Sequence, residues 1–217
     1  MIQVRNVEKR RGSTILWGGL SFSVRPGEVV AVTGPSGAGK STLLDCVGHI
    51  DTVDSGSVVI DGRDAGRSAR RARLVRRDVL GYLFQDFGLV PDLTVAANVD
   101  LARNRHGAVA SDGPTTAAAL AAVGLDGRGT ERTHRLSGGE QQRAAVARLL
   151  VRRPKVVLAD EPTSALDDEN AALVLDHLER LARGGTAVLI ATHASAVVAR
   201  ATRTVELAAP TTAQTRR

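Results

Sequence analysis

The sequence predicts an α/β fold: a parallel sheet wrapped by helices, with an antiparallel β subdomain and an inserted helical subdomain. Three observations predict it. An apolar run at 29–32 leads through a glycine-rich loop into a helix. Apolar runs typical of buried strands return at 156–159 and 187–191, separated by a helical pattern at 169–183. Patterns typical of strands are absent from residues 87–153, which lie between the run at 29–32 and the run at 156–159. Because parallel strands need a crossover connection, usually a helix, this order favours a helix-covered parallel sheet.

Length and composition limit the possible classes of protein. At 217 residues the chain is one domain with a sizeable core. No apolar run approaches the roughly 18–20 residues that span a bilayer, and the N-terminus lacks a signal-peptide pattern, so we expect a cytoplasmic protein. The net charge of +6 is nearly all arginine, and aromatic residues are 2%. Few rings could therefore stack on bases, and no nucleic-acid partner is expected. The single Cys46 is predicted to be a buried structural thiol.

The early strands alternate between apolar and polar residues, as half-buried strands do. They are expected at 2–7 and 20–24, on either side of a turn at 12–13, and at 57–60 before an Asp-Gly hairpin signal. They predict an antiparallel sheet beside the core. The arginine-rich run at 67–77 is expected to be a solvated helix face.

The middle of the chain follows a different pattern. An apolar core strand is expected at 79–84, ending at Gln85, and helical spacing then appears at 94–103, 115–123 and 138–151. The predicted organisation is a nucleotide-binding core with its β subdomain at 1–86 and 154–208, a helical subdomain at 87–153, and a disordered tail at 209–217.

The most informative stretch follows the strand at 29–32. It fits the pattern G-x-x-x-x-G-K-[ST], whose glycines let successive backbone N–H groups point into one concavity and whose helix N-terminus favours a polyphosphate. Lys40 is expected to reach the β- and γ-phosphates, and the Ser41 hydroxyl to bind Mg²⁺. The alternative is a chance match in a chain with 22 glycines. The predicted phosphate-binding residues are Gly34, Pro35, Ser36, Gly37, Ala38, Gly39, Lys40, Ser41 and Thr42.

Two further stretches carry candidate chemistry. The apolar run at 156–159 ends in Asp160, expected to hold Mg²⁺, and Glu161, expected to polarise an attacking water. Ser137 is a good N-cap, and the two glycines after it expose N–H groups where a long helix starts. This predicts a second anion site, with an ordinary capped helix as the alternative.

These motifs, taken in order, resemble the ABC ATPases over almost the whole chain. The resemblance rests on the phosphate loop, Gln85, LSGGEQQR at 136–143, LADE at 158–161, SALD at 164–167 and Thr192-His193. It implies a P-loop NTPase with a RecA-like core that uses ATP and Mg²⁺, and a dimer that sandwiches two ATP molecules. It also implies that the signature residues Ser137, Gly138, Gly139 and Glu140 face the ATP of the other subunit.

The resemblance also implies roles for single residues. Gln85 would contact Mg²⁺ or the lytic water and sense the membrane partner, Asp167 would link the two sites across the dimer, and His193 would hold the γ-phosphate and orient Glu161. Arg11 stands where the family usually has an aromatic residue that stacks on adenine. Either its planar cation lies on the base, or stacking is weaker.

Finer similarity, at 84–95 and 158–163, points to ATPases of macrolide-export, lipoprotein-release and bacteriocin-export systems. The expected function is therefore an ATP-hydrolysing subunit that forms a homodimer and drives a separate membrane permease, on the inner face of the cell membrane, for export of a peptide, lipid or drug-like substrate. One alternative is a mechanotransducing complex that regulates cell-wall hydrolases without transport. Another is a soluble ABC protein of DNA repair or translation, but the long coiled coil and the second ATPase domain of those types are absent from the sequence.

Overall fold

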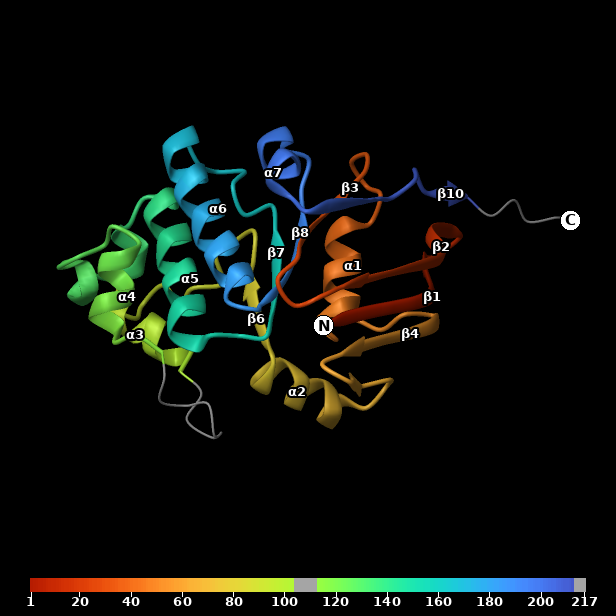
Figure 1. Cartoon of the computed structure of the whole chain (residues 1–217), viewed down its shortest axis with the longest axis horizontal. Coiled ribbons are helices and arrows are strands. Elements are labelled where there is room, and N and C mark those ends of the chain that lie inside the picture. Colours follow the sequence, from red (N-terminus) through yellow and green to blue (C-terminus); the bar gives the residue numbers. More distant parts are fainter. Residues whose placement is uncertain (104–112, 213–217) are drawn as a thin grey trace, which may run out of the picture.

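The computed structural model describes residues 1–103 and 113–212, and it contains two five-stranded sheets (Figure 1). The parallel sheet has the order β6-β7-β8-β3-β9 and the antiparallel sheet the order β10-β2-β1-β4-β5. The strands of the parallel sheet are β3 (Val29–Thr33), β6 (Leu80–Leu83), β7 (Val156–Asp160), β8 (Ala187–Ala191) and β9 (Arg203–Glu206). Those of the antiparallel sheet are β1 (Ile2–Arg11), β2 (Thr14–Val24), β4 (Ser55–Ile60), β5 (Arg63–Asp64) and β10 (Thr211–Thr212).

The helices cover both faces of the parallel sheet. Helix α1 (Lys40–Val47) lies between the two sheets and contacts β4, β7 and β8, whereas α5 (Gly138–Arg152) and α6 (Asp168–Arg183) cover the opposite face (Figure 1). The remaining elements are α2 (Ala69–Asp78), α3 (Val95–Leu101), α4 (Thr116–Ala122), α7 (Ser195–Arg200) and the 3-10 turns Arg128–Thr130 and Thr133–Arg135.

Alternate residues of the parallel strands supply two separate cores. Val157 and Ala159 of β7 pack with the helical side, whereas Val156 and Leu158 pack with α1 and the antiparallel sheet. This alternation follows from the two-residue period of a strand. Because both faces are buried, the strands are continuous apolar runs, and this property made them detectable in the sequence.

Most predicted elements are present, with shifted ends. The first two strands extend to the turn at 12–13, so β1 and β2 are longer than the predicted 2–7 and 20–24. In the described parts of 87–153 the only strand-like feature is one bridge between Thr94 and Arg132, as the helical subdomain requires; residues 104–112 lie outside the described residues.

The C-terminal end differs from the expectation. The sequence predicts no element after 191, yet α7 and β9 follow, and β9 is the edge strand beside β3. Within the predicted disordered tail at 209–217, Thr211 and Thr212 pair with Ile15 and Thr14 of β2, because this edge of the antiparallel sheet offers free backbone groups. Residues 213–217 lie outside the described residues. No helix in the described ranges has both the length and the apolar character to cross a membrane.

Candidate functional site

The glycine-rich loop connects β3 to α1 and wraps around the start of the helix. Gly34, Gly37 and Gly39 have φ values of 144°, 78° and 86°, a region that side chains disfavour. A Cβ on Gly34 would lie 2.6 Å from the carbonyl oxygen of Leu207, and one on Gly39 would lie 3.0 Å from the indole nitrogen of Trp17. Gly39 is also the N-cap of α1 and provides no side-chain cap, so the first N–H groups of the helix remain available to an anion.

Lys40 lies over this loop. Its Nζ donates to the carbonyl oxygens of Gly34 (2.9 Å) and Pro35 (3.2 Å). The ammonium group is therefore held at the mouth of the concavity that the loop N–H groups form. A positive charge at this position suits the phosphates of a nucleotide.

Asp160 ends β7, next to the start of α1. Burial raises the pKa of Asp160, and the nearby Ser41 hydroxyl opposes that rise. Within the described residues Asp160 Oδ1 is buried and has no hydrogen-bond partner. A hydroxyl and an unpartnered carboxylate oxygen are hard donors of the kind that Mg²⁺ prefers, and Mg²⁺ needs only one or two protein ligands. The described ranges contain no cluster of three or more His, Cys, Asp or Glu groups with metal-site geometry.

Glu161, the next residue, is held from two sides. Its Oε1 lies 2.7 Å from Nδ1 of His193, and its Oε2 accepts a hydrogen bond from the Thr192 hydroxyl at 3.2 Å. The backbone of Glu161 has φ 45°, and its N–H donates to the carbonyl oxygen of Ala191 at 2.9 Å. Such a backbone conformation in a non-glycine residue is costly, and the contacts with β8 keep it in place.

Thr192 received no separate role from the sequence. It is completely buried, donates to Glu161, and accepts from the N–H of Ala194 at 3.0 Å. Its position in the sequence could have indicated this role, because Thr192 stands at the end of a buried strand and directly before a candidate catalytic histidine.

Most of the predicted residues outside the signature line one cavity of about 770 Å³ at the carboxyl ends of β3 and β7, but Ala38 is completely buried and Asp160 does not border this cavity. The phosphate loop forms one wall, with Gln85, Glu161 and His193 at one end and Arg11 on the first β-hairpin. Gln85 also lines a shallow depression that it shares with Asp160. Leu16 and Ser164 also line the cavity, although no role was expected for them from the sequence, and the Ser164 hydroxyl donates to the Glu161 carbonyl oxygen at 3.1 Å.

The signature residues lie elsewhere in the chain. Ser137 is the N-cap of α5 and forms a capping box with Glu140, which also pairs with Arg128 at 2.7 Å. Ser137 and Gly138 are exposed, and neither lines the cavity of the phosphate loop. The helix start therefore has the capped geometry that the sequence predicted, and its exposed first residues lie outside the cavity of the phosphate loop. Asp167 is likewise an N-cap: it accepts from the N–H of Asn170 at 2.8 Å at the start of α6.

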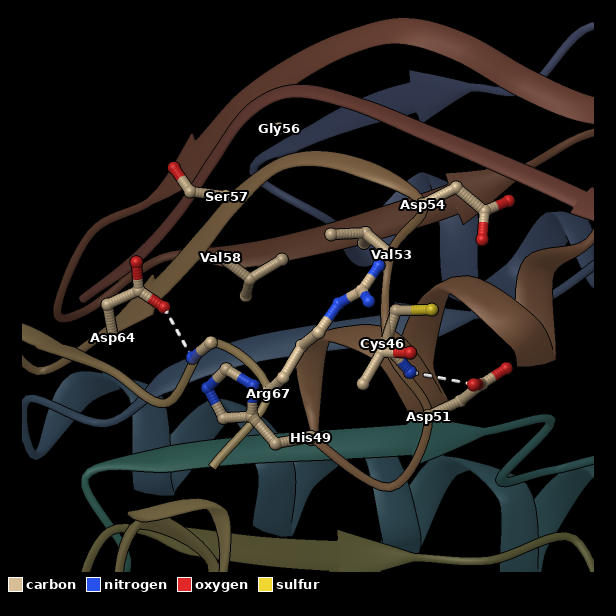
Figure 2. Close-up of a pocket in the computed structure, with 12 residues that line it drawn as sticks. Cys46, His49, Asp51, Val53, Asp54, Gly56, Ser57, Val58, Asp64 and Arg67 are labelled. Atoms are coloured by element: carbon tan, nitrogen blue, oxygen red, sulfur yellow. Dashed lines mark hydrogen bonds between the residues drawn. The ribbon is translucent and has the colours of Figure 1, made fainter. Parts of the chain in front are cut away.

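A separate cavity of about 150 Å³ lies beyond the end of α1, between that helix, β4 and the loop after β5 (Figure 2). It is lined by Cys46, His49, Asp64 and Arg67 among others, and none of the predicted site residues borders it. Burial raises the pKa of the Cys46 thiol to about 12, so the thiol stays protonated and structural, as predicted. Burial also lowers the pKa of His49, which keeps that ring neutral.

A glycine loop between a parallel strand and a helix, with acids at the end of another strand of the same parallel sheet, defines a nucleoside-triphosphate hydrolase. The comparisons make this class specific. The family model described as "ABC transporter" matches residues 17–164. The lipoprotein-releasing system ATP-binding protein LolD of Novosphingobium aromaticivorans is 45% identical over 192 residues, which cover 87% of this chain and 86% of LolD.

A further relative is longer than this chain. The macrolide export ATP-binding/permease protein MacB of Rhodopseudomonas palustris is 41% identical over 190 residues, and the match covers 87% of this chain but only 29% of MacB.

Among solved structures, the dimeric bacterial ABC transporter cassette MJ0796 superposes with a TM-score of 0.85 at 31% identity, over 99% of each chain. Its dimeric post-hydrolysis state, bound to ADP and Pi, gives a TM-score of 0.84 at 31% identity over 95% of this chain and 94% of that one. The chain belongs to the ABC transporter family and is an ATP-hydrolysing ABC ATPase.

Proposed function

We propose that two copies of this chain close on two ATP molecules and thereby drive a separate membrane permease. The observation that carries the proposal is the separation of Ser137 and Gly138 from their own phosphate-loop cavity. Both are exposed at the N-terminus of α5, where N–H groups and the helix dipole favour an anion. A second copy would bring the phosphates of its bound nucleotide to this helix start. The MJ0796 cassettes, which share the fold, are dimeric.

Within each site we assign a different role to each group of residues. The loop N–H groups and Lys40 bind the phosphates, and Ser41 and Asp160, with Gln85 at the edge, would hold Mg²⁺. When bound, Mg²⁺ would supply positive charge to the β- and γ-phosphates. Glu161 accepts a proton from the attacking water, and Thr192 and His193 fix the direction in which its carboxylate points. Asp167 would contact the second copy from the start of α6.

A complementation experiment tests whether two copies of the chain enclose ATP between them. Lys40→Ala removes the phosphate-loop cation, and Gly138→Asp places a carboxylate at the exposed helix start. A Cβ on Gly138 has no neighbour nearer than 3.7 Å, so this substitution leaves the fold intact, and Gly138→Ala is the matched control. Each variant alone should be inactive. Mixed in equal amounts, the two should recover ATPase activity, because a mixed dimer contains one site with an intact loop and an intact signature. A mixture with no activity would contradict the sandwich.

The permease would dock on the surface around Gln85–Thr94 and the helical subdomain. Next to this surface lies a cavity of about 230 Å³ lined by Ile50, Tyr82, Phe84 and Leu101 among others. The Tyr82 and Phe84 rings stack at 4.0 Å, and Ile50 and Leu101 are 49% and 61% exposed. Exposed apolar side chains gathered at one groove are typical of a protein-binding site. The similarity to LolD and MacB supports export or extrusion of a peptide, lipid or drug-like substrate.

Affinity purification tests whether this chain binds a membrane permease. Glu161→Gln, with ATP and Mg²⁺, is used to capture the complex from native membranes, and mass spectrometry identifies what co-purifies. A membrane permease is expected. Adding Leu101→Asp should abolish co-purification, whereas Ala69→Asp, at an exposed residue at the start of α2 and outside the groove, should not. Recovery of a soluble dimer without any permease would contradict this part of the proposal.

A further inference from the structure

The orientation of a nucleotide in the cavity follows from its walls. The phosphate loop holds the phosphates, and Glu161 and His193 mark the γ-phosphate end. The remaining wall comes from the β1–β2 hairpin, where Arg11 and Leu16 line the cavity. Leu16 lies flush against the start of α1, since a Cβ on Gly39 would be 3.2 Å from Leu16 Cδ1. A nucleotide oriented in this way would place its base against Leu16 and Arg11.

No aromatic ring of this chain is available at that wall. The whole sequence has five aromatic residues, all inside the described ranges, and none lines the cavity. Trp17 is 7% exposed and packs behind the loop, and Tyr82 and Phe84 stack on each other at another groove. The five are Trp17, Phe22, Tyr82, Phe84 and Phe87. Base recognition is therefore left to an aliphatic side chain and a guanidinium.

The Arg11 guanidinium is available to a ligand. The side chain is exposed at the end of β1, where Arg11 pairs with Thr14 across the hairpin turn. Within residues 1–103 and 113–212, no hydrogen bond or ion pair fixes its guanidinium. The neighbouring Arg10 differs: it pairs with Glu8 at 2.5 Å and does not line the cavity.

A guanidinium distinguishes purines by their acceptors. Guanine offers O6 and N7, which together accept a bidentate pair of N–H bonds, whereas adenine offers only N7 beside a donating amino group. An exposed guanidinium that can turn toward the base therefore favours guanine. We infer that this nucleotide site accepts guanine nucleotides at least as well as adenine nucleotides, and that Arg11 is the residue that reads the base. The inference rests on the nucleotide orientation of the proposed function and concerns only the base.

The experiment compares steady-state hydrolysis of ATP, GTP, ITP and 7-deaza-GTP by the purified chain. The expected kcat/KM for GTP equals or exceeds that for ATP. ITP should behave like GTP, because hypoxanthine keeps O6 and N7, and 7-deaza-GTP should lose the advantage, because it lacks the N7 acceptor. The differences should lie in KM with kcat alike, since the phosphate end of the site is the same for all four.

Three variants separate the contribution of Arg11 from other causes. Arg11→Tyr should lower the GTP/ATP ratio of kcat/KM about fivefold, which corresponds to about 1 kcal/mol for one bidentate pair. Arg11→Lys keeps the charge but removes the planar fork, and should lower the ratio likewise. Arg10→Gln is the matched control and should leave the ratio unchanged. Circular dichroism checks that each variant is folded.

Two results would overturn the inference: a wild-type GTP/ATP ratio below one, or a ratio that Arg11→Tyr and Arg11→Lys leave unchanged. Either of these, with ATP hydrolysis intact, leaves the proposed dimer and its permease standing. Recovered activity in the mixed-variant experiment tests the dimer independently of the base.

Discussion

Replacing Glu161 by glutamine changes the chemistry of the site while keeping its shape. The amide has the same length as the carboxylate, so it can still accept from Thr192 at the position where the carboxylate does so at 3.2 Å. The strained backbone at φ 45° is unaffected, because the hydrogen bond from the N–H of residue 161 to Ala191 belongs to the main chain. What is lost is the basic oxygen that we propose as the acceptor of the proton of the attacking water.

The size of the effect follows from that loss. A positioned general base contributes about 10²–10⁴-fold, so kcat should fall at least about 100-fold, a rise of about 2.7 kcal/mol in the activation barrier. ATP binding should persist, because Lys40 and the loop N–H groups are unchanged. With ATP bound and not consumed, the dimer should accumulate.

The assays are phosphate release under single-turnover conditions and size-exclusion chromatography with ATP and Mg²⁺. Glu169→Gln is the matched control, since Glu169 is an exposed acid in the first turn of α6, away from the cavity. It should hydrolyse ATP at the wild-type rate and elute as a monomer once ATP is consumed. Full turnover by Glu161→Gln would refute the assignment of the general base.

Other positions give three further predictions. Thr192→Val removes the hydroxyl that orients Glu161 and should lower kcat about tenfold with KM unchanged, since a hydrogen bond to a charged group contributes about 1.5 kcal/mol; a raised KM with normal kcat would contradict this. Gly39→Ala places a Cβ 3.0 Å from an indole nitrogen at φ 86°, and should lower the melting temperature and abolish ATP binding, whereas Gly37→Ala, at φ 78° but in open space, should be milder in calorimetry. Burial raises the pKa of Cys46 to about 12 from 9.0, so above pH 9 the folded state keeps a proton that the unfolded state releases. Stability should therefore fall from about pH 9 toward pH 12 and less steeply in Cys46→Ala, as measured by urea unfolding; equal slopes would refute the assignment.

The parts of the site that the sequence predicted are those in which a short local pattern determines geometry. The phosphate loop follows a strand of four apolar residues and its lysine opens a helix, so the concavity follows from neighbouring residues. The N-cap at Ser137 is equally local, because its hydroxyl accepts from the N–H of a residue three positions later. Its prediction needed no knowledge of the tertiary fold.

Other features depend on long-range pairing and left no local signal. Leu16 and Trp17 are consecutive and both buried, which breaks the alternation of a strand, because the register of β1 and β2 shifts near Lys9. β9 alternates only between half-buried and exposed residues, so its apolar pattern is weak, and it forms because the edge of β3 has unpaired backbone groups. Neither could be found from sequence periodicity alone.

The meeting of the proposed catalytic groups is a consequence of register in the parallel sheet. β8 pairs with both β3 and β7, with Val32 and Asp160 each opposite Ala191, so the three strands end at the same level. The phosphate loop, the acids and the residues at 192–193 leave these strands at that level and meet at one edge, as the carboxyl ends of parallel strands do. A shift of β8 by one residue would reverse the faces of its side chains and separate His193 from Glu161. The position of the general base therefore depends on the strands packed behind it as much as on its own motif, and core substitutions that shift β8 should lower kcat before they lower ATP binding.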